Sequence, residues 1–264
     1  MTSEGLLFTA VCDTNAASPS LGGAAIISFG RCINLVGYNT KAAEANLNYY
    51  APQFTSVGGN TVDIQDISLT DEMGMVGYGD IMQIAGPLGS PMANYAYWAS
   101  YMDPTFTVTK DFYWANEDLT PANVSFDKAD GIGIDNSNSM EYDIGNAGEV
   151  IVGDITIQAS GNLNWLGNPF SANISVQDIE LKDEAGMVGY GDIMQLAGPL
   201  GSPMANYAYW ASYMDPTFTV TKDFYWANED LTPADKTFAP GEGFAIDNSN
   251  SMEYDIVIKC PYSL

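Results

Sequence analysis

The sequence predicts an all-β fold of two tandem β-sandwich or jelly-roll-like domains with minor helix, and three observations carry this prediction. Residues 74–122 return 112 positions later as residues 186–234, with Ile84 exchanged for Leu196 as the single difference in 49 positions. Apolar and polar residues alternate with a period of two in several segments rich in Thr, Val, Ile and aromatics, which is typical of half-buried strands. Pro, Gly, Asn and Asp separate these segments, as turns require.

The repeat extends beyond the 49 residues and so predicts units of domain size. The block IDNSNSMEYDI occurs at 134–144 and again at 246–256, and residues 60–72 match 172–184 more weakly. The glycine-rich stretch GNAG at Gly145–Gly148 is predicted to join the two units. We therefore expect an N-terminal β domain over residues 1–146, with an insertion at residues 41–59, and a C-terminal β domain over residues 147–264.

The expected elements follow from local patterns, taken in chain order. The segment KAAEANLNYYA at 41–51 is the one expected helix. The segments GDIMQIAG and MANYAYWAS flank PLGSP at 87–91, which predicts a hairpin, and FTVTKDFYW at 106–114 is the next strand. IDNSNSMEYDI is expected to form a strand, an Asx-rich turn and a strand, and ITIQAS at 155–160 a further strand.

The charge balance excludes several classes of partner. The chain carries 33 acidic residues against 8 basic ones and a formal net charge of −25. Nucleic acid is excluded as a partner because phosphate contacts need basic side chains, and an anionic membrane surface is excluded by the same repulsion. No run of 18 apolar residues is present, so membrane insertion is not expected.

The composition also argues against catalysis. Histidine is absent, which removes the usual general base and the commonest zinc ligand. No nucleophile motif, phosphate-binding loop or paired-cysteine zinc motif occurs. Neighbouring acids such as Glu117–Asp118 and Glu229–Asp230 are expected by chance in so acidic a chain, and a glycosidase pair must face across a cleft. The chain is therefore predicted not to be an enzyme.

Three cysteines allow at most one internal disulfide. The disulfide candidates are Cys12, Cys32 and Cys260. In an oxidising compartment the third thiol can pair between chains, whereas in a reducing one all three are small apolar residues.

Two short motifs in the C-terminal copy resemble a β-rich repeat module of secreted bacterial surface proteins. NLNWLGNPF at 162–170 falls on a W-N-L-x-G-N-P-like motif, and FAPGEGFAI at 238–246 falls on a P-G-x-G-F-like motif. The first copy departs from both, since INLVGYN at 33–39 lacks the Asn-Pro and DKADGIGI at 127–134 lacks the Pro-Gly. The resemblance implies secretion and an extracellular or cell-surface location, and it supplies no catalytic residues.

The acidic DNSNSMEYD segments place oxygen-bearing side chains at alternate positions. This pattern is faintly similar to a calcium loop, although it lacks the glycine and the terminal glutamate of an EF-hand. An Asx turn in a hairpin explains the same residues without a metal. If calcium binds, the ligands are Asp135, Ser137 and Glu141 with Asp247, Ser249 and Glu253, and no other cofactor is expected.

The aromatic stretch NYAYWASYMDPTFTVTKDFYW has three interpretations. Its rings can lie in a core, at a subunit interface, or on a platform that stacks against sugars. The near-identity of the copies reflects either recent duplication or surfaces that must match, as head-to-tail stacking requires.

Two functions remain open. In the first, the chain is a non-catalytic extracellular structural protein, a self-assembling subunit of a filament, sheath, surface layer or adhesin. Its partners are then copies of itself, through the β-prone segments Leu6–Val11 and Ala24–Phe29 that can add strands to a neighbour and bring Cys12 or Cys32 to Cys260. In the alternative, the chain is a bivalent carbohydrate-binding module with glycans as partners.

Overall fold

The structure, a computed structural model of the chain, confirms the all-β prediction. It describes residues 36–43, 46–70, 80–84, 93–102, 104–105, 109–136, 142–159, 161–182, 191–196, 205–214, 216–217, 221–248 and 253–262. In this part of the chain the helical residues form two single 3₁₀ turns, η1 (Ile64–Asp66) and η2 (Val176–Asp178). No helix of the described part is long and apolar enough to cross a bilayer.

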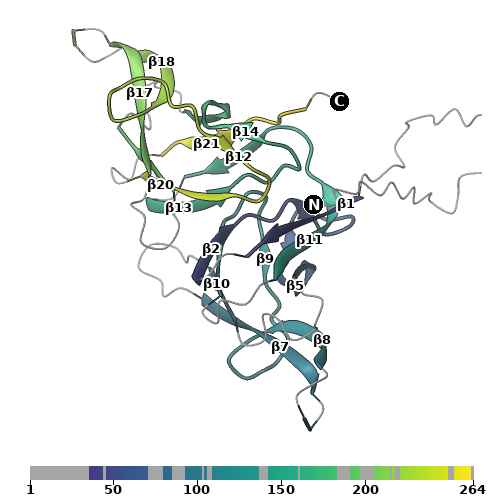
Figure 1. The fold of residues 1–264 in the computed structure, drawn as a ribbon. Coiled ribbons are helices and arrows are strands. Elements are labelled where there is room, and N and C mark those ends of the chain that lie inside the picture. The colour runs from purple at the N-terminus through teal and green to yellow at the C-terminus, as the bar shows by residue number, and fades with distance from the viewer. Residues whose placement is uncertain are drawn as a thin grey trace, which may run out of the picture.

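The first copy of the repeat forms two antiparallel sheets (Figure 1). The smaller sheet places β11 (Asp143–Val150) between β1 (Val36–Ala42) and the strands β3 (Phe54–Thr55) and β5 (Ile67–Thr70). The five-stranded sheet has the order β2 (Asn46–Tyr50), β10 (Ile132–Asn136), β6 (Ile81–Ile84), β7 (Ala93–Met102) and β8 (Thr109–Ala115). A short ladder joins β4 (Val62–Asp63) to β9 (Ser125–Phe126).

The second copy repeats this arrangement strand for strand, apart from β3. Its smaller sheet has the order β12 (Ile155–Gln158), β21 (Asp255–Ile258) and β15 (Ile179–Lys182). Its five-stranded sheet has the order β13 (Asn162–Gly167), β20 (Gly243–Asn248), β16 (Ile193–Gln195), β17 (Asn206–Met214) and β18 (Thr221–Ala227). The short ladder here joins β14 (Ile174–Ser175) to β19 (Thr237–Phe238).

Successive strands change sheets at several points, which gives each copy the strand order of a jelly roll. In the first copy β1, β5 and β11 lie in one sheet while β2, β6 and β10 lie in the other. The three connections between these strands therefore cross from sheet to sheet, as in double-sheet jelly rolls. IDNSNSMEYDI accordingly ends one strand and begins another, as expected. These two strands are in different sheets, however, so a hairpin is the wrong description.

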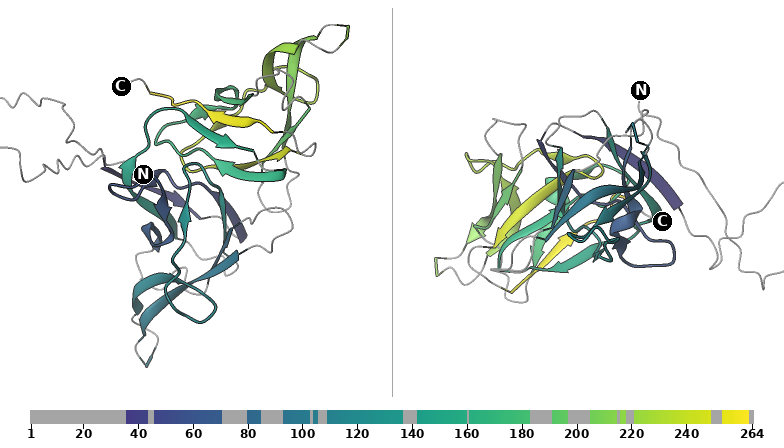
Figure 2. Two further views of the ribbon diagram at one scale, coloured as in Figure 1. Left: turned by 180° about the vertical axis from the view of Figure 1, so that it is seen from behind. Right: turned by 90° about the horizontal axis from the view of Figure 1, so that it is seen from below.

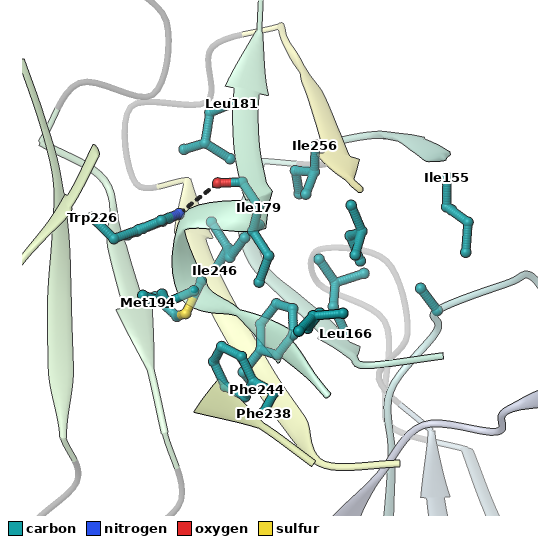
Figure 3. Close-up of a cluster of buried hydrophobic side chains, with 14 of the residues drawn as sticks. Ile155, Leu166, Ile179, Leu181, Met194, Trp226, Phe238, Phe244, Ile246 and Ile256 are labelled. Carbon is teal, nitrogen blue, oxygen red and sulfur yellow. Dashed lines mark hydrogen bonds between the residues drawn. The ribbon is translucent and has the colours of Figure 1, made fainter. Parts of the chain in front are cut away.

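Each copy encloses its own apolar core between its two sheets. The core of the second copy includes the fully buried Trp226, whose indole Nε1 donates to the carbonyl of Ile179 at 2.7 Å (Figure 3). Trp114 and the carbonyl of Ile67 make the same bond in the first copy, again at 2.7 Å. Alternation places these residues inward, because successive strand residues point to opposite faces of a sheet.

The expected helix over residues 41–51 is wrong. These residues form the end of β1 and the whole of β2, and β2 pairs with β10 along its entire length, from Asn46 opposite Asn136 to Tyr50 opposite Ile132. Long-range pairing and the burial of Tyr50 outweigh the helix propensity of the Ala- and Glu-containing segment.

The expected insertion at 41–59 is also wrong, because most of it has a structural counterpart. Tyr50 faces Ile132 in the first copy as Leu166 faces Phe244 in the second, so Asn46–Phe54 corresponds to Asn162–Phe170. The sequences NLNYYAPQF and NLNWLGNPF agree with this pairing, whereas the match to 33–39 does not.

The GNAG stretch is not a linker, since Gly145–Gly148 lies inside β11. Gly145 pairs with Thr40 and Ser68, and Gly148 pairs with Gly37. A Cβ on Gly148 would lie 2.0 Å from the carbonyl oxygen of Thr55. These glycines therefore allow the strands to approach closely, and the chain passes into the second copy beyond Val150.

The two copies meet through contacts related by an approximate twofold axis. The N–H of Ala51 donates to the carbonyl of Gly241 at 3.1 Å, and the N–H of Gly167 donates to the carbonyl of Ala129 at 3.1 Å. Two isolated β-bridges are related in the same way. Tyr50 of the first copy pairs with Glu242 of the second, and Leu166 of the second copy pairs with Asp130 of the first. Such a junction is isologous, because each copy offers the equivalent patch.

Because of this twofold relation the two five-stranded sheets adjoin at their β2 and β13 ends. Tyr49 and Trp165, which occupy equivalent positions, pack edge to face with their ring centroids 5.3 Å apart. The hairpins β7–β8 and β17–β18, called the arms below, project at opposite ends of the molecule (Figures 1 and 2). The arms are identical in sequence in the two copies, whereas several residues that meet at the junction, such as Tyr50 and its counterpart Leu166, differ.

Candidate functional site

The outer face of each arm is a candidate binding surface. On β17 the side chains of Tyr209 and Ala211 are buried against the core, so the alternation turns Ala208 and Trp210 outward. Trp210 lies directly opposite Tyr225 of β18. On the first arm, Trp98 and Tyr113 form the equivalent pair.

The tyrosine of each pair is fixed by a hydrogen bond. The Tyr225 hydroxyl donates to the carbonyl of Leu231 at 3.0 Å, and the Tyr113 hydroxyl donates to the carbonyl of Leu119 at 3.0 Å. Both leucines have left-handed backbone angles, with φ of 63° and 62°, and both are nearly half exposed. Non-glycine residues adopt this conformation at an energetic cost, so the surrounding turn must hold it in place.

The turn that follows β18 is held by its own side chains. Asp230 Oδ1 accepts from the hydroxyl of Thr232 at 2.6 Å and from its N–H at 3.1 Å. These bonds lower the pKa of Asp230, which therefore remains a carboxylate at neutral pH. Asn228 Nδ2 donates to Thr232 Oγ1 at 3.1 Å and to the carbonyl of Pro233 at 3.3 Å. The pair Glu229–Asp230 thus lies in an exposed turn rather than on a strand.

A hollow of about 460 Å³ opens beside this turn. It is lined by Ala205, Asn206, Asn228, Glu229 and Asp230. The same five residue types occupy positions 93, 94, 116, 117 and 118 of the first copy. These described residues present amides and carboxylates, and none of them is basic, next to the outer face of the arm.

A glutamine fixes the base of each arm. Gln177, in η2, donates from Nε2 to the carbonyls of Trp226 and Ala234, each at 2.9 Å, and its Oε1 accepts from the N–H of Trp226 at 3.0 Å. The amide side chain thereby binds the strand as a neighbouring peptide group would. Gln65 makes the same three bonds to Trp114 and Ala122. Sequence reasoning missed both glutamines, although VQDI and IQDI are among the segments that the copies share.

The structure describes three of the six predicted calcium ligands. Asp135 and Asp247 lie half-buried on β10 and β20, and Glu253 is exposed, while Ser137, Glu141 and Ser249 fall outside the described residues. Among the residues that the structure describes, no three His, Cys, Asp or Glu side chains gather as metal ligands. The calcium site remains a prediction.

A buried carboxylate near these aspartates was not anticipated. Asp192 of the GYGDI segment is 2% exposed and accepts from the Tyr254 hydroxyl at 2.6 Å, and Asp80 accepts from Tyr142 at 2.8 Å. Burial, the hydrogen bond to Asp192 and the charges of Asp192 and Asp247 raise the pKa of Tyr254. The bonds connect the two sheets of each copy. Identical GYGDI and MEYDI segments in both copies were the signal that pointed to them.

A second hollow, of about 500 Å³, lies at the junction of the two copies. First-copy residues Asn60, Asp127, Lys128 and Asp130 line it together with residues around β12. Burial is the main reason that the pKa of Asp130 rises to about 6, with the nearby charge of Asp127 as a smaller contribution in the same direction. A hydrogen bond from the N–H of Asp127, 2.8 Å long, acts in the opposite direction.

Of the three cysteines, the structure describes Cys260. It is half-buried, and its Sγ donates to the carbonyl of Tyr262 at 3.4 Å. Cys12 and Cys32 lie outside the described residues, as do the segments Leu6–Val11 and Ala24–Phe29. The proposed disulfides therefore stay predictions.

No protein-family model and no curated protein sequence matches the chain. The class of protein is therefore defined by the fold and the surfaces alone: an acidic all-β chain of two equivalent copies, with identical arms at opposite ends.

Proposed function

We propose that the chain is a non-catalytic extracellular structural protein that assembles with copies of itself. The single observation that carries the proposal is the distribution of the repeat. The arms at opposite ends of the molecule are identical in sequence, whereas several residues that meet at the junction, such as Tyr50 and its counterpart Leu166, differ between the copies (Figure 1).

The approximate twofold axis determines what such an assembly looks like. A contact between the arms of two chains is isologous if each arm offers the same patch to the other. Each chain then has two equal ends, and repetition of the contact extends a linear polymer. The copies inside the chain are related head to head, so this arrangement differs from the head-to-tail stacking expected from the sequence.

The arms have suitable surfaces for such a contact. Tyr213, near the end of β17, is 45% exposed, and Tyr and Trp are enriched where proteins bind one another. The net charge of −25 opposes association, but at physiological ionic strength charges farther apart than about 8 Å are largely screened. The extracellular location rests on the resemblance to secreted surface modules.

The first test uses the equality of the two ends. The Tyr213→Asp variant has one intact arm, so it should stop at dimers, and the Tyr101→Asp/Tyr213→Asp variant should remain monomeric. The parent chain should form longer polymers in sedimentation velocity and in electron micrographs. Val152→Asp is the matched control, since Val152 is equally exposed, at 46%, but lies away from the arms. A parent chain that is monomeric at every concentration and salt would refute the proposal.

The second test separates the arms from the N-terminal segments. A chain without Met1–Ser20 lacks Leu6–Val11 and one of the three cysteines. If arm contacts build the polymer, this chain assembles like the parent. If assembly disappears with the deletion and survives both arm substitutions, strand addition by the N-terminal segment is the contact instead.

A further inference from the structure

We propose that the outer face of each arm, together with the turn beside it, is a binding site for a neutral oligosaccharide. We call this surface the saccharide lane. In the second copy it consists of Asn206, Ala208, Trp210, Tyr225 and Glu229, and in the first copy of Asn94, Ala96, Trp98, Tyr113 and Glu117.

The lane has three successive zones along β17 and β18. Trp210 and Tyr225 face each other at one end, and Ala208 and Ala227 face each other in the middle. Asn206 and Glu229 lie at the other end, at the hollow of about 460 Å³. With a rise of roughly 3.3 Å per residue, the distance from Asn206 to Trp210 is about 13 Å, longer than a single sugar ring.

The middle zone presents the small side chain of Ala208 between the aromatic end and the polar end. Ala208 is half-buried, whereas Ala227 has no exposed surface, so in this zone a ligand can contact Ala208 but not Ala227. Pro233 pairs with Ala227 and brings the turn alongside the edge of β18. A linear ligand can therefore lie along the strands, with one end on the rings and the other in the hollow.

The aromatic end is preorganised. The hydrogen bond from Tyr225 to the carbonyl of Leu231 fixes the tyrosine ring, and the strained backbone of Leu231 is held by the turn. Binding then requires little ordering of side chains, which favours affinity. Flat aromatic rings match the apolar C–H faces of sugar rings.

The polar end selects the kind of sugar. Asn206 can donate and accept hydrogen bonds, and the carboxylates of Glu229 and Asp230 accept them, as the hydroxyls of a sugar require. Among the described residues that line the hollow, none is basic and two are acidic, so a sulfated, phosphorylated or sialylated glycan would be repelled. The chemistry therefore points to a neutral glycan.

The same lane occurs at both ends of the molecule, so each chain offers two equal sites. This inference does not depend on self-assembly, because it concerns the outer face of the arms and not a contact between chains. The two proposals can therefore fail separately.

The experiment uses the full chain and a panel of neutral oligosaccharides, such as cellotetraose, maltotetraose and mannotetraose, with sialylated and sulfated glycans for comparison. We expect a neutral glycan to bind with a stoichiometry of two in titration calorimetry. Trp210→Ala should reduce the stoichiometry to one, with the intact first copy as internal control. Trp98→Ala/Trp210→Ala should weaken binding by roughly tenfold or more, the factor that corresponds to about 1.4 kcal/mol.

Two further variants distinguish a loss of binding from a loss of folding. Asn206→Ala and Glu229→Gln alter exposed side chains, so they should keep the thermal midpoint and still weaken binding at the second site alone. The proposal is overturned if no neutral glycan in the panel binds, if acidic glycans bind better, or if the double tryptophan variant binds like the parent. Sedimentation of each variant shows separately whether assembly persists.

Discussion

At the scale of single residues, equivalent acidic side chains in the two copies are stabilised by different partners. Asp130 and Glu242 occupy equivalent turns of the two copies, and each accepts a hydrogen bond from the backbone N–H three residues earlier. Glu242 also forms an ion pair with Lys236 at 2.6 Å, whereas position 124 of the first copy, the counterpart of Lys236, is a valine. Asp130 is therefore a carboxylate at the junction whose burial is not offset by a basic partner of this kind.

The raised pKa of Asp130 predicts a pH-dependent stability. The folded chain holds the proton with a pKa of about 6, above the ordinary value of 3.8. The folded state consequently loses stability as the pH rises from about 4 to about 6, and the loss persists above that. Asp130→Asn should therefore stabilise the chain at pH 7.5, by about 1–3 kcal/mol, and give no gain at pH 3.5.

Thermal unfolding at the two pH values measures this difference. Glu242→Gln serves as the matched control, because it removes an ion pair and should lower the thermal midpoint or leave it unchanged. If Asp130→Asn unfolds at a lower temperature than the parent at pH 7.5, the ionised carboxylate of Asp130 stabilises the folded chain, and the prediction is wrong.

At the scale of elements, the arms are held to the core by side chains of the 3₁₀ turns. In the second copy Gln177 binds the N–H and carbonyl of Trp226 in β18 and the carbonyl of Ala234 in the turn that follows, and Trp226 lies in the core. Tyr209 of β17 packs against Phe224 and Trp226 of β18, with centroids 5.3 Å and 4.9 Å apart. The arm is thus anchored at its base, while the end of the hairpin extends outward.

Removal of the glutamine should loosen the arm. Gln177→Ala leaves the N–H and carbonyl of Trp226 without these partners, at a cost of about 1–3 kcal/mol, since each bond contributes about 0.5–1.5 kcal/mol. We expect a lower thermal midpoint and faster amide exchange at Trp226. Gln177→Glu retains the acceptor and loses the donor, so it should lie between the parent and the alanine variant. Unchanged exchange in both variants would contradict the anchoring role.

At the scale of the whole molecule, the chain resembles a twofold dimer whose two members are covalently joined. Each copy has its own apolar core, and the two are connected through backbone hydrogen bonds and close glycine contacts. A Cβ on Gly131 would lie 2.7 Å from the carbonyl oxygen of Leu166, and one on Gly243 would lie 2.8 Å from Cβ of Tyr49. The junction therefore depends on positions that admit no side chain.

The two copies should associate without the covalent connection. Residues 1–150 and 151–264, expressed together as separate chains, are expected to copurify as a one-to-one complex. Gly131→Ala and Gly243→Ala should each weaken this complex, because the added methyl group separates the two backbones. Gly145→Ala is the control, since Gly145 lies in β11 and its neighbours, the hydroxyls of Ser68 and Tyr38, belong to the same copy. Copies that never associate would show that the covalent link alone holds them together.

Much of the local structure was predictable because it depends on neighbours in the chain. The hairpins around PLGSP and the strand at 106–114 follow from alternation and turn residues, and the strands β6, β7 and β8 confirm that pattern where they are described. The lane was only partly predictable. Its aromatic residues were evident, but which of them face outward depends on the pairing of Trp210 with Tyr225 and on the burial of Tyr209.

The sequence by itself determined the all-β class, the duplication and the acidic character, because composition and period-two alternation act locally. Only the tertiary structure decided that residues 46–50 are a strand, that GNAG lies within a sheet, and that the copies face each other head to head. Each of these depends on which distant segment supplies the hydrogen bonds of a strand. Tyr50 pairs with Ile132 across 82 residues, and Ala51 bonds to Gly241 across 190, and no local pattern specifies such partners.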